Sequence, residues 1–276
     1  MEQAFTQKIY QKHKECAKCP STILIPQFFT DLLGILFPNF ASKPVLDYVE
    51  FETRIQTIKF ELMQLLSRDG TDEDVDAMAQ SNEFFKILPI VYDKIQMDVD
   101  AMFEGDPAAK TREEVIRSYP GFYAIAAYRV ANALSKIGVN TIPRMITEHA
   151  HGKTGIDIHP NAIIGDYFCI DHGTGVVIGE TTDIGNHVKI YQGVTLGALS
   201  VNKEDAKVKR HPTIEDNVVI YAGATILGGN TIIGKNSIVG GNVWLTKSIP
   251  PESKVYYQAQ MHTDNGKQEP DKIIFK

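Results

Sequence analysis

Apolar residues along the first 153 positions recur at intervals of three and four. The pattern is clearest in VLDYVEFETRIQTIKFELMQLL (45–66) and EEVIRSYPGFYAIAAYRVANALSKIG (113–138). Such spacing is typical of amphipathic helices. The acidic run DGTDEDVD (69–76) is rich in residues that cap helix ends, so we expect it between two helices. Residues 1–153 are therefore predicted to form an α-helical domain.

Beyond residue 153 the aliphatic residues recur mostly at steps of six. They are Ile158, Ile164, Ile170, Ile178, Ile184, Ile190, Leu196, Ile214, Ile220, Ile226, Ile233, Val239 and Leu245. A step of six fits neither a helix nor an alternating strand. It fits a short strand and a tight corner, with three such sides closing a triangular coil of about 18 residues.

Glycine and asparagine suit the corners of such a coil, because a positive backbone φ costs them little. The asparagines in question are Asn186, Asn217, Asn230, Asn236 and Asn242. The sequence thus predicts an α+β fold, in which the helical domain precedes a parallel β-helix of about four coils. We place this β-helix at 154–253 and a C-terminal tail at 254–276.

Three departures from the six-residue step indicate where function lies, because the repeat by itself specifies only a shape. The step is eight between Ile170 and Ile178, eighteen between Leu196 and Ile214, and seven between Ile226 and Ile233. The second departure predicts an excursion loop at 198–211. Loops on a regular scaffold commonly carry binding and catalytic residues.

The first departure, IDHGTGVV, contains His172 beside Asp171. The six-residue register puts Asp157 on the same edge of the prism, one coil away, and adjacent coils are about 4.8 Å apart. A bond from Asp157 would orient the imidazole as a general base. The alternative is a surface histidine at a corner, but the neighbouring acids and the inserted residues favour catalysis.

The second departure ends in KVKRHP (207–212), where Arg210 offers a planar fork for a carboxylate and His211 a further hydrogen-bond partner. The alternative is a solvated basic loop end. Because Ile170 and Ile214 stack on different sides of the coil, His172 and His211 of one chain need not share an edge. They would meet if three prisms packed around a threefold axis.

Composition narrows the choice of partners and compartment. The formal net charge of the 276 residues is −6, which excludes a general attraction to nucleic acid or anionic membrane and favours a small-molecule partner. The most apolar passage, 22–40, is broken by Pro26, Asp31 and Pro38, so we do not read it as a membrane span.

The cysteines and histidines exclude further classes. Three cysteines make no disulfide framework, so we expect exposed thiols at Cys16 and Cys19, a packed Cys169 and a reducing, cytoplasmic setting. The spacing of the eight histidines does not match a β-helix zinc enzyme, and no second cysteine pair is present. We therefore predict no metal.

Several motifs in a fixed order resemble the serine acetyltransferases. They are GDPAA (105–109), GFYAIAAYRVA (121–131), TGIDIHPNAIIGDYFCIDHGTGVVIGET (154–181), VTLGA (194–198) and KRHPTI (209–214). The match covers more than half of the chain and is far more specific than the hexapeptide repeat. It implies a left-handed β-helix and an enzyme of cysteine biosynthesis that makes O-acetyl-L-serine from L-serine and acetyl-CoA.

The resemblance also implies roles for individual residues. It makes His172 the general base and Asp157 its partner in a direct, ternary-complex transfer without an acyl-enzyme. It lines the serine pocket with Asp106, Asp171, Arg210 and His211. It puts acetyl-CoA along the prism edge, with the pantetheine arm at Gly197, Ala198 and Ala222 and the phosphates near Lys235 or Lys247.

Assembly and regulation are expected from the same resemblance. It implies a homotrimer through the β-helices, a dimer of trimers through the helical domains, and L-cysteine as feedback inhibitor. Tyr123 stands where the family usually has histidine. Family members that dock into O-acetylserine sulfhydrylase end in isoleucine, whereas this chain ends in Lys276, so we do not expect that complex.

Two alternatives stay open at this point. One is a hexapeptide acetyltransferase that acts on the hydroxyl of a sugar or an antibiotic, and the other is a non-catalytic solenoid that only binds. Asp106 and Arg210 favour an amino-acid acceptor, because a zwitterion needs both charges and a neutral sugar needs neither.

Overall fold

The computed structural model describes residues 2–16, 19, 21–68, 76–199, 208–261 and 271–273. The predicted acidic run, excursion loop and C-terminal tail lie partly outside these ranges. The helices are α1 (Glu2–Glu15), α2 (Leu24–Leu36), the 3-10 turn η1 (Pro38–Phe40), α3 (Tyr48–Leu66), α4 (Ala77–Gly105), α5 (Arg112–Ser118), α6 (Pro120–Lys136) and α7 (Ile142–Thr154).

The chain divides into two compact units, and three helices run from one into the other. Unit 1 comprises Met1–Asp93 and Ala127–His149, and unit 2 comprises Lys94–Ala126 and Ala150–Lys276. The stretch Lys94–Ala126, which contains the predicted site residue Asp106, therefore belongs with the strands. None of the helices among the described residues has the length and hydropathy needed to cross a membrane.

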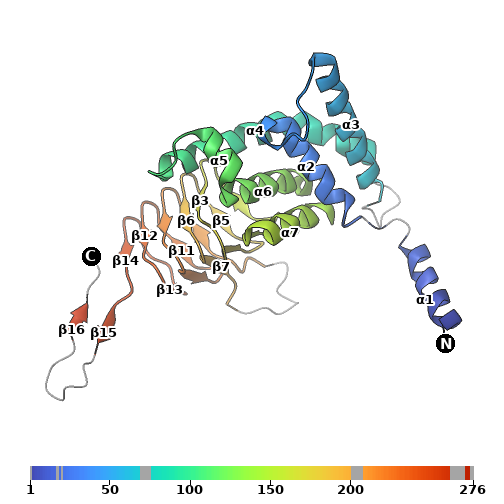
Figure 1. Ribbon diagram of the computed structural model, residues 1–276. Coiled ribbons are helices and arrows are strands. Elements are labelled where there is room, and N and C mark those ends of the chain that lie inside the picture. The colour runs from blue at the N-terminus through green and yellow to red at the C-terminus, as the bar shows by residue number, and fades with distance from the viewer. Residues whose placement is uncertain are drawn as a thin grey trace. The chain divides into compact units, whose positions relative to one another are not determined.

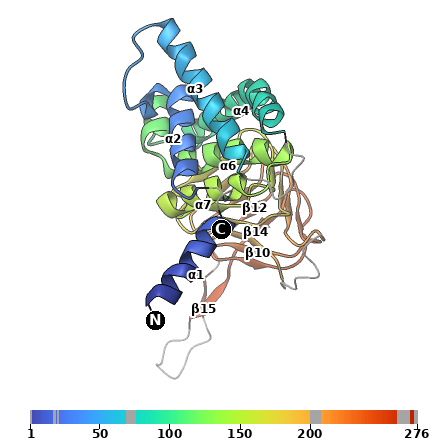
Figure 2. The same ribbon diagram turned by 90° about the vertical axis from the view of Figure 1, so that its right-hand side faces the viewer.

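In unit 1, α2 packs against α3 (Figure 2). The packed faces are apolar at helical spacing: Ile25, Phe28, Phe29, Leu32 and Leu33 of α2 are buried, as are Ile58, Leu62, Leu65 and Leu66 of α3. The helix predicted within 45–66 is thus confirmed. The one predicted within 113–138 is present as two helices, because Tyr119 is extended and Pro120 begins α6.

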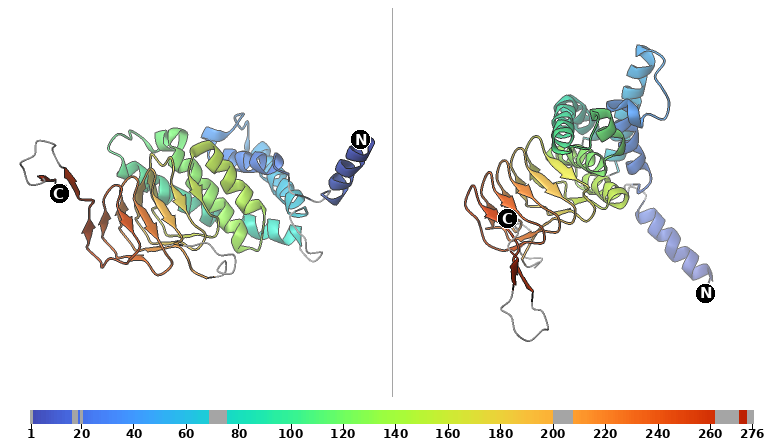
Figure 3. Two further views of the ribbon diagram at one scale, coloured as in Figure 1. Left: turned by 90° about the horizontal axis from the view of Figure 1, so that it is seen from below. Right: turned by 60° about the vertical axis from the view of Figure 1, so that its left-hand side comes forward.

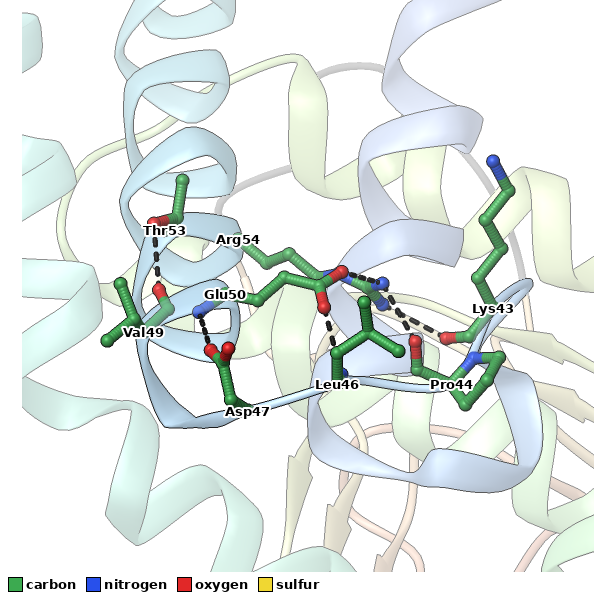
Figure 4. Close-up of polar contacts among 8 residues, drawn as sticks. All are labelled: Lys43, Pro44, Leu46, Asp47, Val49, Glu50, Thr53 and Arg54. Atoms are coloured by element: carbon green, nitrogen blue, oxygen red, sulfur yellow. Dashed lines mark hydrogen bonds and ion pairs between the residues drawn. The ribbon is translucent and has the colours of Figure 1, made fainter.

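The start of α3 is fixed by side chains rather than by apolar packing (Figure 4). Asp47 caps the helix by accepting a hydrogen bond from Glu50 N at 2.8 Å. Glu50 accepts another from Leu46 N, and its pKa lies below the ordinary value because of that bond and the ion pair with Arg54. Arg54 also donates to the carbonyls of Lys43 and Pro44. This network holds the segment that leads into α3.

Unit 2 contains a three-sided parallel β-solenoid (Figures 1 and 3). Its strands are β1 (Asp157–Ile158), β2 (Ile163–Ile164), β3 (Cys169–Asp171), β4 (Val177–Ile178), β5 (Asp183–Ile184), β6 (Lys189–Tyr191), β7 (Thr195–Gly197), β8 (Thr213–Ile214), β9 (Val219–Ile220), β10 (Thr225–Leu227), β11 (Ile232–Ile233), β12 (Ile238–Val239), β13 (Trp244–Leu245) and β14 (Lys254–Val255). A separate antiparallel pair, β15 (Ala259–Met261) and β16 (Asp271–Ile273), follows.

Each side of the solenoid is one sheet. Side A is β1-β4-β7-β10-β13, side B is β2-β5-β8-β11 and side C is β3-β6-β9-β12-β14. The predicted aliphatic positions pair in register, as Ile158 with Ile178 on side A and Ile170 with Ile190 on side C show. Two sheets have five strands, so the stack has about one more turn than predicted, and β14 extends side C beyond Leu245.

The corners explain much of the polar sequence between the strands. Asn217, Asn236 and Asn242 have positive φ as predicted, whereas Asn186 and Asn230 do not. Four larger residues also take this conformation: Tyr167, His172, His187 and Glu252. The rings of Tyr167 and His187 stack at 4.5 Å between centroids, a contact between coils that offsets the cost of their left-handed backbone.

The prediction for two of the cysteines was wrong. Cys16 and Cys19 form a disulfide rather than two free thiols. The chain turns at the end of α1, with a hydrogen bond from Cys19 N to Cys16 O, and this brings the two Cα atoms to 4.9 Å. That separation is within the range a disulfide requires. Cys169 is free and buried in the solenoid, as predicted.

Candidate active site

The first departure from the repeat forms the corner that leads from side C to side A. Here His172 has a φ of 59°, and its side chain is 72% exposed. Its Nε2 atom lies 3.6 Å from Asp171 Oδ1. A side chain at Gly173, which also has positive φ, would come within 2.5 Å of Ile156. The tight glycine turn therefore presents the imidazole outward, next to a carboxylate.

A second carboxylate, Asp106, follows the end of α4 and belongs to the same cluster. Its oxygens accept hydrogen bonds from the hydroxyl of Tyr119 and from Ala108 N. These bonds, with smaller effects of Lys189 and His172, hold the pKa of Asp106 below its ordinary value. The same hydrogen bond raises the pKa of Tyr119 to about 12. Asp106 is thus an ionised carboxylate close to His172.

The start of α6 packs directly on the strand that carries this corner. A Cβ atom at Gly121 would lie 2.5 Å from Ile170 O, so only glycine allows this approach. Two residues on, the hydroxyl of Tyr123 accepts a hydrogen bond from Lys153 Nζ at 3.2 Å, and the ammonium lies 4.9 Å from the ring centroid. Tyr123 therefore ties α6 to the last turn of α7.

Asp157 begins β1, and its backbone partner is Val177, the first residue after the His172 corner. Asp157 and His172 thus share the edge between sides C and A, as the register predicted. The carboxylate at ion-pair distance from His172 is that of Asp171, and Asp157 has an oxygen within 4.8 Å of a His151 ring nitrogen. The bond between Asp157 and His172 stays a prediction.

The second departure builds the corner between sides A and B, where Arg210 and His211 lie. Arg210 pairs with Glu180. Burial raises the pKa of Glu180, but the hydrogen bonds from Arg210 and Asn161 outweigh it and leave that pKa below its ordinary value. The backbone N–H of Arg210 donates to Thr181 Oγ1 at 2.9 Å, which fixes the start of the strand.

His211 is almost fully buried, in contrast to His172. Its Nδ1 accepts a hydrogen bond from Thr181 N at 3.1 Å, so the neutral ring carries its proton on Nε2. Burial, together with the charge on Arg210, lowers the pKa of His211 to about 4. The ring occupies the space beside Gly179, where a Cβ atom would lie 2.1 Å from Nε2.

Within one chain the two corners lie on different edges of the solenoid. The predicted coenzyme residues divide in the same way. Gly197, Ala198 and Lys247 lie on the edge between sides A and B with Arg210 and His211, whereas Ala222 lies on the edge of His172. Lys235 is on the third edge, in a hollow of about 640 Å³ shared with Asp183, Glu215 and Asp216. Three carboxylates there disfavour a phosphate.

Two other hollows help to delimit the site. One of about 390 Å³ lies at the edge between sides A and B and is lined in part by Leu199, Gly229 and Lys247. The other, of about 510 Å³, lies in unit 1 between α2 and α3. None of the predicted site residues lines it.

Known proteins resemble the chain over most of its length. It is 46% identical over 221 residues to a plasmid-encoded serine acetyltransferase of Synechococcus elongatus, across 76% of this chain and 69% of that protein. It is 50% identical over 143 residues to serine acetyltransferase of Bacillus licheniformis, across 52% of this chain and 61% of the relative. A scan against models of protein families gives no match.

Solved structures agree in fold. Serine acetyltransferase 1 of Entamoeba histolytica in complex with L-cysteine is 35% identical, with a TM-score of 0.76 over 83% of this chain and 86% of that one. The chain belongs to the serine acetyltransferase family. Serine acetyltransferase of Neisseria gonorrhoeae in complex with serine is 26% identical, with a TM-score of 0.58 over 87% of this chain and 95% of that one.

As a serine acetyltransferase family member the chain is an acyltransferase, and the predicted fold is confirmed. The structure adds polar neighbours of the site that the sequence did not reveal: Tyr119, Glu180, Thr181 and Lys189. Their partners lie 13 to 30 residues away, and 84 residues away for the bond from Lys189 to Gly105. The one sign of these neighbours in the sequence was Lys189, a lysine at a strand position one coil after Asp171.

Proposed function

We propose that the chain is a serine O-acetyltransferase, which transfers the acetyl group of acetyl-CoA to the hydroxyl of L-serine and yields O-acetyl-L-serine and CoA. The observation that carries this assignment is the pair of carboxylates, Asp106 and Asp171, beside the exposed His172. Two carboxylates supply the negative charge that the ammonium of an amino acid needs and that a neutral sugar does not need. The relatives named as serine acetyltransferases support the same substrate.

His172 acts as the general base in the proposed reaction. Its imidazole takes the proton of the serine hydroxyl as the oxygen attacks the thioester carbon, and it returns a proton to the departing sulfur. Asp157 orients the ring in this proposal, while Asp106 and Asp171 hold the ammonium close to it. Holding both reactants at one corner supplies much of the rate enhancement and needs no acyl-enzyme.

Arg210 and His211 complete the site from a neighbouring chain. Their edge differs from that of His172 within one solenoid, so a threefold arrangement that sets unlike edges side by side would bring them together. The guanidinium of Arg210 then binds the substrate carboxylate. His211, neutral at pH 7, donates from Nε2 to the substrate or to the oxyanion.

Acetyl-CoA lies in the groove between the same two edges in this proposal. Backbone groups of Gly197 and Ala198 on one chain and Ala222 on the other contact the pantetheine arm. Lys247 lines a hollow at that edge and is our choice for the phosphates, ahead of Lys235 with its acidic surroundings. L-cysteine differs from L-serine at one atom, so we propose that it inhibits by occupying the serine pocket, as the cysteine-bound relative suggests.

An acceptor panel tests the assignment. Release of the CoA thiol from acetyl-CoA is measured with L-serine, D-serine, L-homoserine and a galactoside, each against a blank without acceptor. We expect release with L-serine, and weaker release with D-serine and L-homoserine because their hydroxyl cannot reach His172 while both charges are bound. Preference for the galactoside would show a sugar acetyltransferase, and no release with any acceptor would favour the binding protein.

A further inference from the structure

Lys189 lies on β6 at the centre of the acidic corner, and its side chain is only 17% exposed. Its ammonium donates to Asp171 Oδ2 at 2.9 Å and to Gly105 O at 2.6 Å. It also lies 4.5 Å from the centroid of the Tyr191 ring. One cation thus joins β3, the strand that ends at Asp171, to the end of α4, where Asp106 follows Gly105.

We propose that Lys189 is a positioning residue for acetyl transfer, which holds Asp171 and the Asp106 segment in the arrangement that receives the ammonium of the acceptor. The inference rests on the proposed function, because it names the acceptor as an amino acid. It concerns a residue that acts through Asp171 and Gly105 and does not touch the substrate.

The two oxygens of the Asp171 carboxylate face different side chains, and this supports the role of Lys189. Its Oδ2 is bound by Lys189, which leaves Oδ1 facing His172 at 3.6 Å. With Asp171 only 13% exposed, a carboxylate without that partner would face the cost of burial and repulsion from Asp106. Lys189 therefore stabilises two neighbouring negative charges in the absence of substrate.

The charge of Lys189 is itself secured by its surroundings. Burial by itself lowers its pKa, but the contacts with Tyr191 and Asp171 outweigh this and raise the pKa above the ordinary value. Lys189 is thus protonated throughout the neutral range. Asp106 is fixed in a similar way, by the Tyr119 hydroxyl and Ala108 N. Both carboxylates are therefore preorganised by this chain rather than by the substrate.

Lys189→Met tests the inference, because methionine keeps much of the apolar stem and removes the charge. We expect the KM for L-serine to rise by about tenfold, with a smaller change in kcat and an unchanged KM for acetyl-CoA. The charged and titratable groups around His172 at this corner are Asp106, Asp157, Asp171, Tyr119, Cys169 and Lys189. Loss of one positive charge among them favours the imidazolium, so the acid limb of the kcat/KM profile should move to higher pH.

Lys94→Met is the matched control. Lys94 also joins α4 to the solenoid through an ion pair, with Asp166, but on the edge between sides B and C. We expect it to leave the KM for L-serine and the pH profile unchanged. Lys189→Arg keeps the positive charge on a longer side chain. It should restore the acid limb of the kcat/KM profile to its wild-type pH, but only part of the affinity for L-serine. It also serves as the test variant if Lys189→Met does not fold.

The outcomes separate this inference from the proposed function. A wild type that releases no thiol with L-serine contradicts the proposed function and removes the acceptor named here. If the wild type is active and Lys189→Met behaves as Lys94→Met does in both KM and pH profile, the inference alone is overturned. Where Lys189→Met does not fold, an unchanged KM for L-serine in Lys189→Arg has the same meaning. Lys189 is then an ion pair that serves packing only.

Discussion

The two histidines of the site are the same residue in opposite surroundings. The side chain of His172 is 72% exposed and faces a carboxylate from a left-handed backbone. His211 is 8% exposed, accepts a bond from Thr181 N, and has its pKa lowered to about 4 by burial. The first setting suits a residue that gains a proton during the reaction. The second suits a neutral ring that donates from Nε2.

The surroundings of each histidine determine its role, as base or as donor, in the proposed reaction. A ring whose pKa is about 4 is a weak base, so His211 is poorly suited to deprotonate a hydroxyl at pH 7. The pattern of the sequence alone offers no such distinction, since both histidines stand at interruptions of the repeat. The sharpest tests are those that treat the two histidines differently.

The largest expected effect is that of removing the base. His172→Ala should lower kcat with L-serine by about 10³-fold, because the proposed mechanism uses its imidazole to take the proton. Thiol release at saturating substrates measures it. The matched control is His187→Ala, which removes an imidazole from a corner with a φ of 54°, close to the 59° of His172, so the backbone cost is the same.

Near-normal turnover in His172→Ala would contradict the mechanism. A comparable loss in His187→Ala would point to damage to the solenoid instead, because the His187 ring stacks on Tyr167 on another edge. A loss confined to His172→Ala, with the size of the assembly unchanged, assigns the effect to chemistry.

The second effect distinguishes a donor from a base. His211→Ala should lower kcat/KM for L-serine by about 100-fold, and His211→Gln by about tenfold, because glutamine keeps an N–H donor in reach of the Nε2 position. His172→Gln should recover nothing. Equal losses in His211→Gln and His211→Ala would argue against the donor role.

The same residue links stability to pH. His211 titrates at about 4 in the folded chain and near 6.5 when unfolded, so the unfolded state binds more protons between these values. The wild type should therefore lose stability as the pH falls from 6.5 to 4, a loss that is weaker in His211→Gln. Thermal melts across this range measure the difference.

Gly179→Ala should displace the His211 ring and so reproduce part of the activity loss of His211→Ala. Gly152→Ala, with nothing within 4 Å of its Cβ, should leave activity unchanged.

How much of the structure the sequence predicts depends on how far apart in the chain the interacting residues lie. The stacking of Ile158 on Ile178 depends on a local period, and so does the shared edge of Asp157 and His172. The disulfide between Cys16 and Cys19 needed a turn that their spacing permits but does not require. The contacts of Lys189 with Gly105 and of Arg210 with Glu180 join segments 84 and 30 residues apart, and no period in the sequence indicates them.

The smallest of the three effects concerns Asp157. The strand register places Asp157 on the edge of His172, whereas its carboxylate lies within 4.8 Å of a His151 ring nitrogen. If Asp157 orients His172 during turnover, Asp157→Asn should lower kcat by about tenfold, the value of one charge-assisted hydrogen bond. Asp166→Asn, which removes a carboxylate from the third edge, is the control. An unchanged kcat in Asp157→Asn would mean that Asp171, at 3.6 Å, is the carboxylate partner of His172. The exposed histidine would then depend on its sequence neighbour, as the buried one depends on Thr181.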